Sequence, residues 1–106
     1  MKITLQYFDG CPNWKMTKAD LTTLIADHGL EATISYQLID TPEAAEEHNF
    51  RGSPTVLMEG VDPFADPDAP TGLSCRIYKT ETGMAGTPSL SQLEEALSAF
   101  DVAPLE

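Results

Sequence analysis

The hydrophobic pattern changes its period near the N-terminus, and no other feature constrains the fold of this chain as strongly. Residues 2–8 alternate between two faces, which is the period of a β-strand. From Pro12 onward the apolar residues recur at helical spacing, and Gly29 is typical of the position that follows a helix. The chain therefore begins with a strand and a helix, and Cys11 stands at their junction.

Three further elements are predicted in the first half of the chain. Residues 32–38 alternate again and predict a second strand. Thr41 and Pro42 are typical of a helix N-cap and first helical position, and they predict a short helix that ends at about His48. Residues 55–58 form a short apolar strand. Because a strand–helix–strand unit needs a crossover connection, we expect the first two strands to be parallel.

The second half is predicted to add one strand and one helix. Residues 61–73 hold three prolines and are expected to form an irregular loop. Residues 74–79 predict a fourth strand, and a glycine turn over 83–86 leads to a final helix over 90–100 that is capped by Ser89 or Ser91. The predicted order is β-α-β-α-β-β-α, with the last two strands antiparallel.

The composition excludes several classes of protein. At 106 residues the chain is expected to be one domain. Its net charge of −11 repels nucleic acid and anionic membranes, so neither is an expected partner. No run approaches the roughly 18 apolar residues that span a bilayer, and no signal-peptide pattern is present, so we expect a cytoplasmic location. No Cys/His spacing is typical of zinc, and no cofactor is expected.

Cys11 is the candidate nucleophile. It follows the first strand and an Asp9-Gly10 turn, and it is expected to open the helix. The unpaired N–H groups and the positive dipole end of a helix start favour the thiolate, which is the reactive form of cysteine. Lys15 shares a helix face with Cys11. Arg51 precedes the Gly52-Ser53-Pro54 turn, and a small positive patch would surround the thiol if the two elements meet.

The motifs on both sides of the predicted site resemble those of a known family. A Cys11-Pro12 helix start after the first strand, combined with a Gly-Ser-Pro-Thr turn over 52–55, resembles the thioredoxin-like superfamily along almost the whole chain. The resemblance implies an α/β fold with a central mixed four-stranded sheet flanked by helices, and a Pro-rich insertion before the last strand. It also implies that Pro54, preceded by Ser53, follows a cis peptide bond and faces the reactive cysteine.

The resemblance implies a redox function with one departure from the dithiol members. Those members carry a second cysteine where this chain has Trp14, so no disulfide can close within the motif. A glutaredoxin-like monothiol scheme remains, in which Cys11 attacks a disulfide or peroxide. The second thiol would be external, such as a low-molecular-weight thiol, or it would be Cys75. The substrate would be a small or protein thiol or disulfide. The residues expected to bind it are Trp14, Lys15, Arg51 and Ser53.

Cys75 could instead have only a structural role. Cys75 shares strand parity with Ile77, which favours the core face, and a free cysteine is often a small buried hydrophobe. The resemblance also implies that Cys75 lies at the end of the sheet away from Cys11.

The chain could instead be a binding domain that holds an extended peptide at Pro54. It could also be a soft-metal protein whose two thiols bind Hg(II) or Cu(I).

Overall fold

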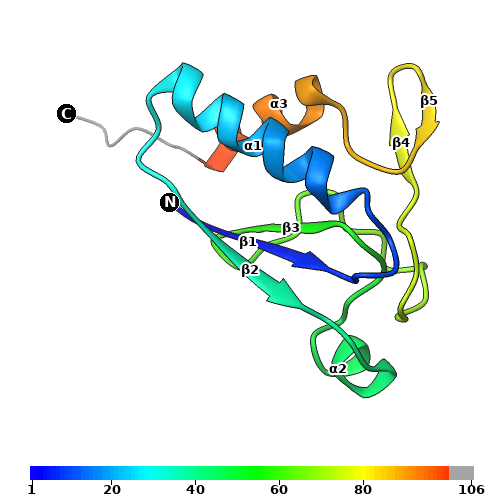
Figure 1. The fold of residues 1–106 in the computed structure, drawn as a ribbon. Helices are drawn as coiled ribbons and strands as arrows, with labels where there is room; N and C mark the ends of the chain where they lie inside the picture. The colour runs from blue at the N-terminus through cyan, green and yellow to red at the C-terminus, as the bar shows by residue number, and fades with distance from the viewer. Residues whose placement is uncertain (101–106) are drawn as a thin grey trace.

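A mixed three-stranded sheet forms the centre of the computed structural model, which describes residues 1–100 (Figure 1). The middle strand is β1 (Lys2–Tyr7), which pairs in parallel with β2 (Thr33–Leu38) and antiparallel with β3 (Thr55–Met58). The α/β class, the three strand positions and the parallel β1–β2 pairing are therefore confirmed.

Two helices cover one face of this sheet. Helix α1 (Trp14–His28) connects β1 to β2, and α3 (Leu90–Phe100) lies beside it (Figure 1). Because side chains alternate along a strand, Ile3 and Leu5 share one face of β1 and pack beneath these helices. Full burial of each such side chain stabilises the fold by roughly 1.5–3 kcal/mol. The other buried members of this core are Leu21, Leu24, Val56, Met58, Leu93, Ala96 and Leu97.

The helix ends follow the predicted signals, except at the start of α1. Gly29 adopts the left-handed conformation that ends α1, with φ of 60°. Ser89 caps α3, because its hydroxyl accepts from the Gln92 amide while the Gln92 side chain accepts from the Ser89 amide. The expectation that Cys11 opens α1 is wrong. A turn intervenes, and the helix begins at Trp14.

The third helix, α2 (Pro42–Glu47), lies at the end of β2 on the side away from α1 and α3 (Figure 1). The Thr41 hydroxyl accepts a hydrogen bond from the Ala44 amide, which confirms the predicted N-cap. Ala45 packs with Ile39 and Phe50 in a second small core. No helix among residues 1–100 is both long and apolar enough to cross a bilayer.

The fourth strand does not join the central sheet. Strand β4 (Tyr78–Thr80) pairs instead with β5 (Gly83–Ala85) in a separate antiparallel hairpin, and β5 was expected to be part of a turn. The segment just before β4 makes a single bridge, between Ser53 and Cys75. This bridge is parallel and isolated, so the antiparallel pairing expected for the last two strands of the sheet is wrong. The central sheet therefore has three strands instead of the expected four, and β4 and β5 form a separate hairpin.

Candidate functional site

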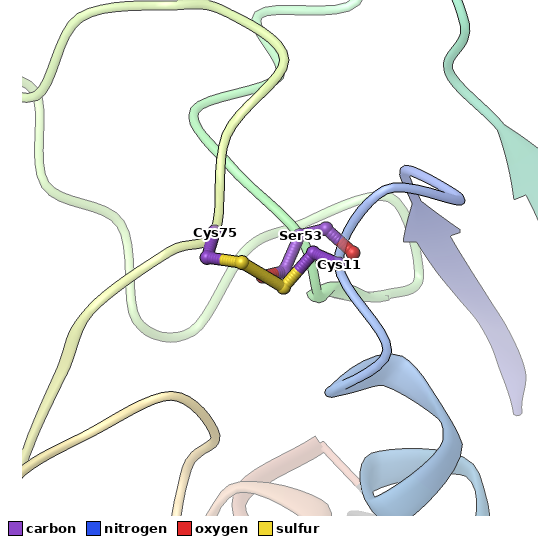
Figure 2. Close-up of a disulfide and its surroundings, with 3 residues drawn as sticks. All are labelled: Cys11, Ser53 and Cys75. Carbon is purple, nitrogen blue, oxygen red and sulfur yellow. A yellow bond between two sulfur atoms is a disulfide. The ribbon is translucent and has the colours of Figure 1, made fainter.

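Cys11 and Cys75 form a disulfide, although 64 positions separate them in sequence (Figure 2). Their Cα atoms are 5.6 Å apart, which is within the usual range for a disulfide. The prediction that Cys75 lies on the core face, away from Cys11, is wrong. Cys75 is exposed and directly bonded to Cys11. The reason is that Arg76 and Tyr78 occupy the inward positions of this segment.

Cys11 lies in the turn between β1 and α1 and has no exposed surface. Its amide donates to the Phe8 carbonyl oxygen over 3.0 Å, and its sulfur lies 3.7 Å from the carbonyl oxygen of Ser53. The amides of Asn13 and Trp14 have no backbone acceptor within residues 1–100. These two N–H groups and the positive end of α1 are close in sequence to Cys11 and favour a thiolate there when the disulfide opens, whereas the complete burial of Cys11 opposes it.

Backbone hydrogen bonds hold the segment of Cys75 against the loop of Pro54. The Ser53 amide donates to the Ser74 carbonyl oxygen over 2.7 Å, and the Arg76 amide donates to the Ser53 carbonyl oxygen over 2.9 Å. The Ser53–Pro54 peptide is cis, as the resemblance implied. Ser53 is fully buried, and its hydroxyl has no hydrogen-bond partner among the described residues. The two sulfurs are therefore positioned by backbone pairing as well as by their own bond.

Arg76 anchors the Pro-rich loop over 61–73 from inside the protein. Its guanidinium pairs with the Asp62 carboxylate at 2.7 Å and donates to the Thr55 hydroxyl at 3.2 Å. It also donates to the Phe64 carbonyl oxygen. Only 8% of the Arg76 side chain is exposed, so these partners replace the water that the charge has lost.

Tyr78 completes this interior arrangement. Its hydroxyl donates to the Pro54 carbonyl oxygen over 2.5 Å, and its ring lies 4.6 Å from the Arg76 guanidinium carbon. Burial raises the pKa of Tyr78; Arg76 opposes that shift and Asp62 adds to it. The sequence interpretation did not single out these residues. The signal was an arginine and a tyrosine two positions apart in a strand pattern, with an acidic partner in the preceding loop.

The residues expected to bind substrate are not all brought to Cys11. Ser53 contacts the Cys11 sulfur. Trp14 stacks on Tyr7 with ring centroids 4.4 Å apart, and the Lys15 ammonium lies 6.0 Å from the Trp14 ring. Arg51 donates to two carbonyl oxygens of the Pro-rich loop. The head groups of Lys15 and Arg51 are thus directed to partners other than Cys11.

A cleft of about 680 Å³ opens beside Cys75. Ile77 and Met84 line it and are 68% and 70% exposed, so its rim is apolar. Three of the six basic residues of the chain also line it, in a protein of net charge −11. These three are Arg51, Arg76 and Lys79. Arg76 is paired with Asp62, and Asp66 also lines the cleft, so Arg51 and Lys79 supply its remaining positive charge. The cleft therefore combines a disulfide cysteine, an apolar rim and a small excess of positive charge.

The chain matches no protein-family model and no curated protein sequence. Within residues 1–100, no group of three or more His, Cys, Asp or Glu side chains is placed to hold a metal ion. The described residues bring together a disulfide and a cleft.

Proposed function

We propose that this protein is a small thioredoxin-like thiol–disulfide oxidoreductase that cycles between the Cys11–Cys75 disulfide and the corresponding dithiol. One observation carries the proposal, namely the bond between a buried Cys11 and an exposed Cys75 at the mouth of a cleft. A disulfide with an accessible sulfur is open to exchange with external thiols. The substrate would be a thiol or disulfide, either small or part of a protein.

Several features of the fold support the thioredoxin-like assignment. The parallel β1–β2 pair is connected through α1, and β3 lies antiparallel on the other side of β1. A cysteine follows β1, and Pro54 immediately precedes β3. In this proposal the β4–β5 hairpin is the divergent counterpart of the fourth strand, and a single parallel bridge connects the segment before it to Ser53.

The disulfide favours Cys75 over an external thiol as the partner of Cys11. In one direction of the cycle, the dithiol reduces a substrate disulfide to two thiols and is itself oxidised to the Cys11–Cys75 disulfide. In the other direction, two external thiols reduce the disulfide and form a disulfide with each other. Two electrons and two protons pass in each direction, so no further cofactor is required.

The cytoplasmic location stays a prediction from the sequence. Disulfides that form in that compartment are mostly transient and are used for catalysis or redox sensing. A purely structural disulfide in a non-catalytic binding domain is the competing interpretation. Such bonds typically have reduction potentials below about −300 mV and resist the cellular glutathione pool.

Equilibration in dithiothreitol and glutathione buffers, followed by alkylation, tests the proposal. We expect a midpoint above about −300 mV. We also expect the protein to accelerate electron transfer from dithiothreitol to a small disulfide such as hydroxyethyl disulfide. The Cys75→Ser variant should lose this acceleration, whereas Ser35→Ala, at an exposed position on β2, should keep it. A more negative midpoint without acceleration would leave a structural disulfide in a binding domain.

A further inference from the structure

The two cysteines of the disulfide differ in their exposure to solvent. A thiolate attacks a disulfide sulfur along the S–S axis, from the side opposite the leaving sulfur. Cys11 has no exposed surface, and its sulfur is in contact with the Ser53 carbonyl oxygen. Cys75 is exposed, lines the cleft, and lies on a loop outside the turn that holds Cys11 (Figure 2). An incoming thiol can therefore reach Cys75 but not Cys11.

The two sulfurs also differ as leaving groups. A thiol of lower pKa leaves faster in disulfide exchange. Cys11 stands just before α1, where the free amides of Asn13 and Trp14 and the helix dipole favour a thiolate. Cys75 has no helix start after it. The adjacent guanidinium of Arg76 is turned inward to Asp62. The helix start thus favours departure of Cys11 as a thiolate, whereas the complete burial of Cys11 opposes it, so access is the stronger argument for attack at Cys75.

The charge around the cleft also favours attack of an external thiolate at Cys75. Thiolates are anions, and a chain of net charge −11 repels them over most of its surface. The cleft beside Cys75 is lined by Arg51, Lys79 and the acidic Asp66, and also by Arg76, whose charge is buried and paired with Asp62. Arg51 and Lys79 therefore outnumber Asp66 where the exposed Cys75 lies.

We infer that Cys75, and not Cys11, is the sulfur that exchanges with external thiols, and that Cys11 is the buried leaving and resolving group. An external thiolate attacks the Cys75 sulfur, the S–S bond breaks, and Cys11 departs with the electron pair as a thiolate. A second external thiolate then attacks the sulfur that the first thiol contributed, which releases Cys75. This assignment of roles rests on the proposed function and reverses the roles expected from the sequence.

Trapping of the mixed disulfide tests the assignment on the oxidised wild-type chain. The protein is mixed briefly with glutathione as the probe and quenched in acid, which protonates the thiolates and stops exchange. Free thiols are then blocked with N-ethylmaleimide in denaturant, and the peptides are mapped by mass spectrometry. We expect glutathione on Cys75 and the maleimide on Cys11, in an excess of about tenfold or more over the reverse pattern.

A pair of single-cysteine variants gives a second measurement. Cys11→Ser leaves Cys75 free, and Cys75→Ser leaves Cys11 beneath a nearly isosteric side chain. At pH 8 we expect Cys11→Ser to react with the aromatic disulfide DTNB at least about tenfold faster than Cys75→Ser, because the reagent can reach Cys75 but not the buried Cys11. Near-ultraviolet circular dichroism checks that both variants are folded.

The outcomes separate the two proposals. Glutathione found mainly on Cys11, or faster reaction of the Cys75→Ser variant, would overturn the assignment of roles and leave the oxidoreductase proposal standing. A disulfide that neither glutathione nor dithiothreitol opens in the folded protein would overturn both.

Discussion

Tyr78 and Pro54 are joined by a buried hydrogen bond, in which the tyrosine hydroxyl donates to the proline carbonyl oxygen over 2.5 Å. Pro54 immediately precedes β3, and Tyr78 is the first residue of β4. The bond therefore connects the detached hairpin to the edge of the central sheet. It also satisfies a carbonyl oxygen that would otherwise be buried without a partner.

Replacement of this hydroxyl should destabilise the fold in a pH-dependent way. We expect Tyr78→Phe to lower the free energy of unfolding at pH 7 by about 1–3 kcal/mol, because the Pro54 carbonyl loses its donor. Burial raises the pKa of Tyr78 above its ordinary value of 10.0. Above that pH, Tyr78 ionises in the unfolded wild-type chain but stays protonated in the folded one. Wild-type stability therefore falls as the pH rises above 10.0, and the variant lacks this contribution.

Denaturant unfolding between pH 7 and pH 11 measures both effects. The difference between wild type and Tyr78→Phe should narrow as the pH rises above 10.0. Tyr36→Phe is the matched control, because Tyr36 is 46% exposed on β2. A difference that stays constant over this range would contradict the assigned role of burial.

The ion pair between Arg76 and Asp62 should contribute strongly to stability. We expect Asp62→Asn to cost about 3–5 kcal/mol, because it leaves the Arg76 charge buried without its counter-ion. Asp68→Asn is the control, since Asp68 is exposed in the same loop and should change stability by less than about 0.5 kcal/mol. Chemical denaturation at pH 7 measures both. Equally small losses of stability in Asp62→Asn and Asp68→Asn would show that water takes the place of the Asp62 carboxylate beside Arg76.

The sequence predicts the periods of the strands and helices but not which face of residues 74–79 points inward. Local alternation allows two phases for this segment. The phase that buries Cys75 and Ile77 is the more apolar one, so the sequence favours it. The other phase places Arg76 and Tyr78 inside, and it is stable only because Asp62 and the Pro54 carbonyl are available as partners. Those partners come from distant parts of the chain, so no local pattern could reveal them.

For the same reason, the sequence offers Cys75 only as one of two alternatives for the thiol that pairs with Cys11. Its formation depends on the single bridge between Ser53 and Cys75, which brings the exposed cysteine to the turn of Cys11. The cap signals, in contrast, were correct at Gly29, Thr41 and Ser89. Each of these is a contact within four residues and is encoded locally.

Removal of the disulfide should lower the free energy of unfolding, because the unfolded chain gains conformational freedom. With 64 positions between the cysteines, loop-closure entropy predicts a loss of about 4 kcal/mol. We expect the double variant Cys11→Ser/Cys75→Ser to show a loss of this size in urea denaturation relative to the oxidised wild type. Wild type kept in excess dithiothreitol should match the double variant. A loss near zero in both would mean that the unfolded chain already keeps these segments close.

A methyl group at Gly52 should displace the segment that carries Cys75. Gly52 has φ of 124°, and a Cβ atom there would lie 2.9 Å from the backbone nitrogen and Cα of Arg76. Gly83 has a similar φ of 120°, but a Cβ atom there meets open space. Because both substitutions strain the backbone alike, the difference between them isolates the contact with Arg76.

We expect Gly52→Ala to lower the free energy of unfolding by about 1–3 kcal/mol more than Gly83→Ala does. The displaced backbone should also loosen the hydrogen bond from the Arg76 amide to the Ser53 carbonyl oxygen, which helps to hold Cys75 in place. Dithiothreitol should therefore reduce the disulfide of Gly52→Ala faster than that of Gly83→Ala, as followed by timed alkylation and mass spectrometry. Equal stability and equal reduction rates would mean that the Arg76 segment shifts without cost, and that the bridge to Ser53 does not position Cys75.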